Sequence, residues 1–190
     1  LRQDVVKPEL LFLGTEFGLY VSVDAGRSWT HLKKAIPTAS VMDLVIHPRE
    51  HDLVLGTHSR GIWILDHMNA LRELTPSVAA KPLHLFRMRA AEQIRYRDAL
   101  GHTGDVFYTG ENPPKGAIVD LWMREDGTAT VTIHEQGGAE VAKLTVNGKA
   151  GINRAVWDLR YAGNGPFVHL GNYGVRVSAG TATTSGTLEV

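Results

Sequence analysis

Short runs of apolar residues that alternate with polar ones recur along the whole chain. A period of two is the pattern of a β-strand that buries one face. Prolines and glycines stand between the runs, where φ must be fixed or positive. In the first part of the chain this pattern predicts strands at residues 10–13, 19–23, 29–32, 42–46, 53–55 and 62–65.

A second series of strands is predicted after Gly116. Short strands separated by turn-forming dipeptides are typical of a small antiparallel β-sandwich. The strands are expected at residues 117–123, 128–134, 140–146, 154–160, 173–178 and 183–190. The turn dipeptides are Asp126-Gly127, Gly137-Gly138, Asn147-Gly148 and Asn164-Gly165.

Between the two series, prolines interrupt the pattern, and residues 77–116 are predicted to connect two domains, 1–76 and 117–190. A short strand at 83–86 and a helix at 90–97 are the elements expected in this connector. Its arginines form either a small anion-binding patch or a solvated face beside nearby acidic residues. These arginines are Arg87, Arg89, Arg95 and Arg97.

The first part of the chain contains a repeat. Gly14-Thr15 recurs 42 positions later as Gly56-Thr57, and residues 10–20 align with residues 52–63 with one extra residue in the second loop. A repeat of this length built from strands alone is typical of a β-propeller blade. A closed ring needs at least about four blades. We therefore expect an all-β chain with partial propeller blades, about one and a half, belonging to a longer protein.

Composition narrows the functional classes. The 20 basic and 20 acidic residues cancel, which gives no global field to attract nucleic acid. No apolar run approaches the ~18 residues of a membrane span, so membrane insertion is not expected. The chain has no cysteine, which excludes disulfides, thiolate metal sites and a cysteine nucleophile.

Residues 22–29 carry the most specific motif, Ser-x-Asp-x-Gly-x-x-Trp. Ser22 and Asp24 have short side chains that can bind turn amides, Gly26 can adopt a positive φ, and Trp29 is expected to plug the start of the next strand. This motif is similar to the Asp-box (BNR repeat) of sialidase-type and sortilin-type propellers. Residues 10–74 resemble the final blades of large bacterial proteins of that superfamily, often labelled glycosyl hydrolases. The resemblance implies a structural role for the motif, away from the ligand face, and a periplasmic or extracellular parent protein.

The second half resembles another known module. Residues 151–158 and 171–177 are similar to the immunoglobulin-like module of flagellar hook-capping proteins, which is also appended to secreted bacterial enzymes. Leu159 replaces a usual Gly and Leu170 a usual Pro, both in turns. Trp157 is expected to fill the core of this immunoglobulin-like β-sandwich.

The propeller resemblance also implies a candidate site. In that family the loops between the second and third strands form the ligand face, and here these loops contain Glu16, His58 and Arg60. A carboxylate beside an imidazole orients the ring and raises its pKa, which would make a general base, and Arg60 could bind an anion or oxyanion. The alternative is that Glu16 and His58 are ordinary loop residues that satisfy local turn amides.

The metal prediction remains open. Histidines and aspartates are dense between residues 43 and 67, but their spacing forms no compact motif such as His-Glu-x-x-His. Ca²⁺ held by carboxylates from separate loops is the metal that fits this composition. No other cofactor is expected.

Two functions follow as hypotheses. The first is a non-catalytic binding or scaffolding fragment with a carbohydrate or small-molecule ligand. The second is a small hydrolase of lactone, ester or glycosidic bonds, with or without Ca²⁺, that uses the Glu16, His58 and Arg60 face. Sialidases use three arginines and a Tyr-Glu pair, and this set cannot be assigned here. Open strand edges in residues 10–65 predict self-association.

Overall fold

A computed structural model describes residues 1–33, 36–94, 114–162 and 165–190. The described residues form mostly strands, every ladder between neighbouring strands is antiparallel, and none of the sheets they form closes on itself. The predicted all-β class is therefore confirmed. The chain divides into two compact units, Leu1–Ala79 and Ala80–Val190, and each is described by itself.

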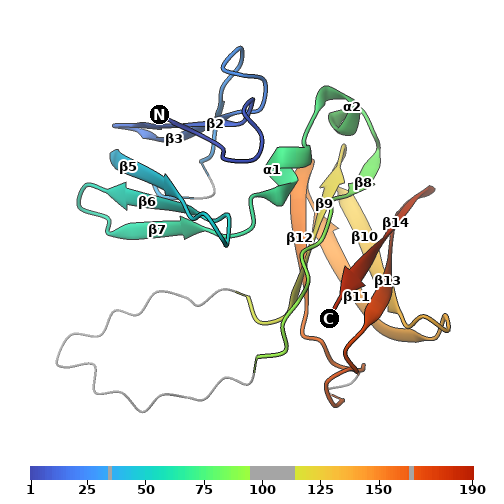
Figure 1. Ribbon diagram of the computed structural model, residues 1–190. Helices are drawn as coiled ribbons and strands as arrows, with labels where there is room; N and C mark the ends of the chain where they lie inside the picture. The colour runs from blue at the N-terminus through green and yellow to red at the C-terminus, as the bar shows by residue number, and fades with distance from the viewer. Residues whose placement is uncertain (34–35, 95–113, 163–164) are drawn as a thin grey trace. The chain divides into compact units, whose positions relative to one another are not determined.

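The first unit contains two sheets, drawn in blue and teal in Figure 1. The first sheet has the order β1-β2-β3-β4, with β1 (Arg2–Gln3), β2 (Leu11–Thr15), β3 (Gly18–Ser22) and β4 (Thr30–His31). The second has the order β5-β6-β7, with β5 (Val41–Ile46), β6 (Leu53–Thr57) and β7 (Ile62–Leu65). The two copies of the sequence repeat are thus the β2–β3 and β6–β7 hairpins.

The core of the first unit consists of apolar side chains from both sheets. Phe12, Leu19 and Val21 come from the first sheet, and Leu53 and Leu55 from the second, and all belong to one buried cluster. Full burial of such a side chain stabilises the fold by about 1.5–3 kcal/mol. Because side chains alternate along a strand, burying these residues determines which face of each hairpin points inward.

Two short helices, α1 (Asn69–Glu73) and α2 (Pro76–Ala79), end the first unit. The sequence predicted neither of them. At the position of the expected helix, residues 90–94 are not helical, and residues 95–97, with Arg95 and Arg97, lie outside the described residues. In the part of the chain that the structure describes, no helix is long and apolar enough to cross a membrane.

The second unit contains two further sheets, with the orders β11-β10-β13-β14 and β12-β9-β8. Long strands joined by tight turns dominate it, in the green-to-red part of Figure 1. The strands are β8 (Leu83–Leu85), β9 (Ala117–Met123), β10 (Gly127–His134), β11 (Glu140–Gly148), β12 (Gly151–Trp157), β13 (Asn172–Ala179) and β14 (Ala182–Glu189).

The core of the second unit includes the predicted tryptophan. Trp157 is 1% exposed, its Nε1 donates a hydrogen bond to the Arg160 carbonyl oxygen at 3.0 Å, and its ring packs edge-on against Tyr173. Its expected place in the core is confirmed. Leu159, which stands where the resembled module has Gly, is buried and has a φ of 61°. The turn therefore uses the left-handed conformation that Gly adopts most easily.

Two local predictions differ from the structure. Asn147-Gly148 is not a turn: both residues end β11, where they pair with Thr128 and Gly127. The chain instead turns two residues later, at Lys149-Ala150, and Gly151 begins β12 with a φ of 119°. β8 lies inside the predicted connector, yet it pairs with β9 along its whole length and so belongs to the second unit.

Candidate functional site

Glu16 lies at the exposed tip of the β2–β3 hairpin. The threonine before it closes the turn, because Thr15 Oγ1 donates to the Gly18 carbonyl oxygen at 3.0 Å and accepts from the Phe17 amide at 3.2 Å. Gly18 has a φ of 129°, which a side chain would strain. Local turn chemistry thus leaves the Glu16 carboxylate pointing to solvent.

His58 and Arg60 lie in the β6–β7 loop, and both are exposed. Thr57 closes this loop as Thr15 closes the first: its Oγ1 donates to the Gly61 carbonyl oxygen at 2.6 Å. The His58 amide donates to the Ser40 carbonyl oxygen at 2.9 Å, and Trp63 Nε1 donates to the Arg60 carbonyl oxygen at 2.9 Å. The repeated Thr is therefore a loop-closing residue, and the side chains of His58 and Arg60 are not used in the closure.

The two loops lie at the same end of the stacked sheets. A Cβ added to Gly14, near the end of β2, would come 2.7 Å from Cγ1 of Val41. Val41 is paired with Thr57, the residue before His58. In the described part of the chain, however, no hydrogen bond or ion pair joins the side chains of Glu16, His58 and Arg60. Their joint action as a catalytic group stays a prediction.

The side chains of the Ser-x-Asp-x-Gly-x-x-Trp motif connect the two ends of the β3–β4 turn. Ser22 Oγ donates to Asp24 Oδ1 at 2.7 Å and accepts from the Gly26 amide at 2.8 Å. Asp24 then accepts from the Ser28 amide at 2.9 Å and from Ser28 Oγ at 2.5 Å. Both carboxylate oxygens are thereby used within the turn, and Gly26 has the expected positive φ of 87°.

This network stabilises the charged form of Asp24. The hydrogen bonds from the Ser28 hydroxyl and amide, followed by the one from Ser22, lower the pKa of Asp24 from 3.8 to about 2. Each of these donors favours the charged carboxylate. Ser28 was not among the predicted motif residues. Its hydroxyl, two residues after Gly26, is the feature of the sequence from which this contact could have been predicted.

Trp29 differs from the expected plug. Its side chain is 37% exposed, and it precedes β4 rather than lying within it. A Cβ added to Gly26 would lie 3.8 Å from Trp29 Cζ2, so the ring covers the turn from outside. The reason is geometric: the two-residue strand β4 is at the edge of its sheet, where a side chain has neighbours on one side only.

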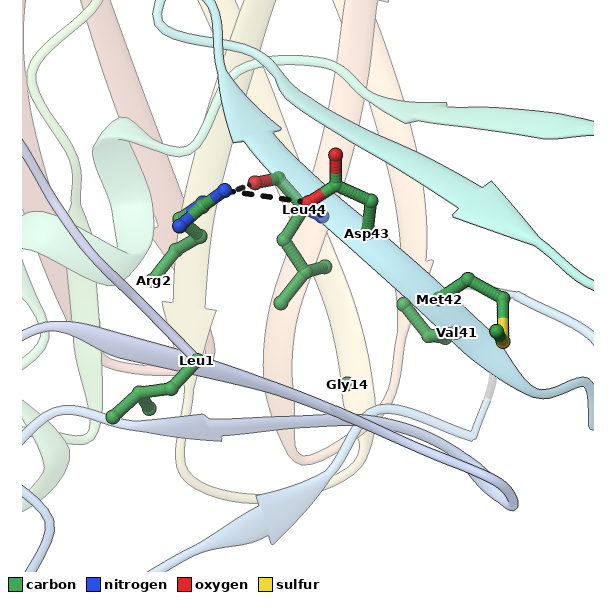
Figure 2. A pocket seen from close by; sticks show the side chains of 7 residues that line it. All are labelled: Leu1, Arg2, Gly14, Val41, Met42, Asp43 and Leu44. Atoms are coloured by element: carbon green, nitrogen blue, oxygen red, sulfur yellow. Dashed lines mark hydrogen bonds and ion pairs between the residues drawn. The ribbon is translucent and has the colours of Figure 1, made fainter.

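A small open cavity of about 100 Å³ lies between β2 and β5, and Figure 2 shows it from close by. Arg2 spans its side, donating from Nε to the Leu44 carbonyl oxygen at 2.6 Å and pairing with Asp43 at 3.3 Å. The lining residues are Leu1, Arg2, Gly14, Val41, Met42, Asp43 and Leu44. The cavity is well below the ~300 Å³ of small-molecule sites, so it suits a few water molecules.

In the segment rich in histidine and acidic residues, side chains accept hydrogen bonds from backbone amides. His47 Nδ1 accepts from the Glu50 amide at 3.0 Å, and Asp52 Oδ1 accepts from the His67 amide at 3.1 Å. Among the described residues no three histidine or acidic side chains come together as a metal site. Binding of Ca²⁺ by carboxylates from separate loops stays a prediction.

Two ion pairs with buried carboxylates, at Asp4 and Asp120, were not predicted from the sequence. Arg72 Nη2 donates to Asp4 Oδ1 at 2.6 Å and its Nε to Asp4 Oδ2 at 2.9 Å, with Asp4 fully shielded from solvent. Burial would raise the pKa of Asp4, but the Arg72 hydrogen bonds and two backbone amides outweigh it and lower the pKa. Arg154 binds Asp120 in the same two-point way across β12 and β9. No local pattern marks partners so distant in sequence.

A comparison of the chain with models of known protein families, with curated proteins and with solved structures finds no significant match.

Proposed function

We propose that the chain is a non-catalytic binding or scaffolding part of an exported bacterial Asp-box protein, located in the periplasm or outside the cell. In this proposal residues 1–76 are partial propeller blades and residues 117–190 are an immunoglobulin-like module. The sequence motifs support it, together with two stacked antiparallel sheets built from one repeat.

One observation carries the proposal: the polar groups of the most specific motif are engaged in the fold. Both oxygens of Asp24 and the hydroxyl of Ser22 hold the β3–β4 turn, at the opposite end of β3 from Glu16. Such a motif stabilises a scaffold and leaves ligand contact to other loops.

The ligand surface in this proposal is the shared end of the two hairpins. Glu16, His58 and Arg60 offer exposed hydrogen-bonding groups there, and Phe17 adds a ring that is 68% exposed. Polar groups around an aromatic ring suit carbohydrate hydroxyls and ring faces. A carbohydrate or another small polar molecule is the proposed ligand class.

The shared end of the hairpins also favours a second candidate, a small hydrolase of lactone, ester or glycosidic bonds with or without Ca²⁺. Loops that converge can bring a carboxylate, an imidazole and a guanidinium to one substrate even when the unliganded side chains do not touch. In this candidate His58 is the general base, Glu16 orients it, and Arg60 stabilises the oxyanion.

The two candidates are separated by assaying the chain with lactones, aryl esters and aryl glycosides, with and without a Ca²⁺ chelator. The binding proposal expects no turnover above the uncatalysed background. Glu9→Ala and His169→Ala, at exposed positions elsewhere, are the matched controls, and under the hydrolase candidate they keep the wild-type turnover. Turnover that falls at least about tenfold in both Glu16→Ala and His58→Ala would overturn it in favour of the hydrolase.

A ligand screen tests the binding proposal directly. Immobilised oligosaccharides should retain the chain, and Phe17→Ala and Arg60→Ala should each weaken retention, whereas Glu9→Ala should not. If Phe17→Ala, Arg60→Ala and Glu9→Ala were all retained as strongly as the wild type, the ligand would bind elsewhere on the chain.

The open sheet edges are the remaining proposed surface for partners. β1, β4, β5 and β7 each lack a neighbour on one side within their sheets, which leaves backbone groups that pair readily with another strand.

A further inference from the structure

The outer face of the second sheet is apolar and exposed. Ile62 is 74% exposed, Ile64 57% and Val45 50%, with half-buried Val54 between the last two. The ladders place Val45, Val54 and Ile64 in one row across the three strands, and Asp43, Gly56 and Ile62 in the next row. Asp43 lies at the β5 edge of this face and pairs with Arg2. These residues are called the β5–β7 outer face below.

The first sheet has an equivalent face, and that face is buried. Phe12 pairs with Val21, and Gly14 with Leu19, just as Val54 pairs with Ile64, and Gly56 with Ile62. The repeat thus makes Phe12 equivalent to Val54, Leu19 to Ile62 and Val21 to Ile64. Phe12, Leu19 and Val21 are at most 5% exposed.

The side chains that cover this face in the first sheet come from the second. Leu53 and Leu55 share the buried cluster with Phe12, and Trp63 packs against it. Their equivalents in the first sheet, by the same ladders, are Leu11, Leu13 and Tyr20. These alternate with Phe12 and Val21 along their strands, so they lie on the opposite face, where they are half-buried.

The glycines support the same equivalence. A Cβ on Gly14 would come 2.7 Å from Val41 of the covering sheet, whereas one on Gly56 would meet only Asp43 of its own ladder, at 3.9 Å or more. Gly56 thus leaves room for close approach by another sheet, and nothing among the described residues fills that room.

We propose that the β5–β7 outer face binds a second copy of this chain, through the Leu11, Leu13 and Tyr20 face of its β1–β4 sheet. In this contact, sheets of two molecules stack in the same way as the two sheets stack within the first unit. The two surfaces differ, so the interface is heterologous, and a dimer keeps one free surface of each kind, one on each copy. Association then continues head to tail, using faces rather than the strand edges.

The test is sedimentation velocity of the whole chain over a wide concentration range. The wild type should form species beyond a dimer as concentration rises. Ile64→Lys should weaken association at least about tenfold, since a lysine buried in an apolar contact is left without a partner. Leu170→Lys, at a position 77% exposed in the second unit, is the matched control and should associate like the wild type.

A mixing experiment tests the pairing of unlike faces. Leu13→Lys should also stop self-association, and an equimolar mixture of Ile64→Lys and Leu13→Lys should form a one-to-one dimer through the two intact faces. Leu13→Thr replaces Leu13→Lys if circular dichroism shows that the latter does not fold.

Three outcomes would overturn the proposal. They are a wild type that is monomeric at every concentration, assembly that Ile64→Lys does not weaken, and variants that fail to complement each other on mixing. The second outcome would assign assembly to the strand edges.

Discussion

Ser22 and Asp24 in the β3–β4 turn show how one turn can determine the acidity of a side chain. Asp24 accepts hydrogen bonds from Ser22 and from both donors of Ser28, and its pKa falls to about 2. The lowered pKa means that the folded chain binds this proton more weakly than the unfolded chain does.

Replacing Asp24 by Asn should therefore change how stability depends on pH. The contribution of the Asp24 charge is complete above pH 3.8 and is lost as the pH falls through about 2. Urea unfolding at a series of pH values should show a wild type more stable than Asp24→Asn by a constant amount from about pH 5 upward. The difference should shrink from pH 4 toward pH 2, and a gap that is constant down to pH 2 would contradict the assignment.

Leu159 shows two opposing effects at one residue. Its φ of 61° costs roughly 1–3 kcal/mol relative to an ordinary conformation, whereas its buried side chain contributes about 2–5 kcal/mol as judged by Leu→Ala changes. The second effect is the larger, which explains why a leucine can stand where a glycine would be less strained.

At the scale of elements, sequence reasoning succeeded where one periodic signal governed a segment. Strands such as β2, β6 and β10 follow the alternation, and the Gly-Thr repeat marked the two hairpins whose loops Thr15 and Thr57 close. It failed where a tertiary contact decided the outcome. The ladder with β10 extends β11 through Asn147-Gly148, and α1 is too short to show a helical period.

The candidate site was partly predictable for the same reason. The loops that carry Glu16 and His58 follow from the hairpin pattern, and their common end follows from stacking two copies of one repeat. The exposed ring of Trp29 did not follow, because a motif gives residue types and not the width of the sheet beside them.

The Asp4–Arg72 pair joins the start of the first unit to α1, and its loss should be costly. Arg72→Met leaves a buried carboxylate without its counter-charge, which costs about 3–5 kcal/mol of the free energy of unfolding. Arg49→Met, which removes an exposed partner of Glu50, should cost less than about 1 kcal/mol. Chemical denaturation measures both, and adding Asp4→Asn to Arg72→Met should recover part of the loss.

At the scale of the whole molecule, the chain has two units, each with its own core and its own tryptophans. Phe12 lies in the core of the first unit and Val131 in that of the second. Trp29 and Trp63 belong to the first unit, and Trp122 and Trp157 to the second.

We expect the two units to unfold in separate transitions. Phe12→Ala should lower the stability of the first unit by about 3–5 kcal/mol and leave the transition of the second unit unchanged. Val131→Ala should destabilise the second unit and leave the transition of the first unit unchanged. In variants that keep only the tryptophans of one unit, the fluorescence reports the unfolding of that unit alone, which assigns each transition. A single transition that both substitutions shift equally would show that the units unfold together.

The separation of Asp4 from Arg72 by 68 residues also affects how the chain is made. During synthesis the ribosome releases Asp4 long before Arg72, and until the arginine emerges the first sheet cannot bury that carboxylate favourably. The nascent first unit therefore waits for nearly its full length before it closes, and its folding should be slow compared with that of its individual hairpins.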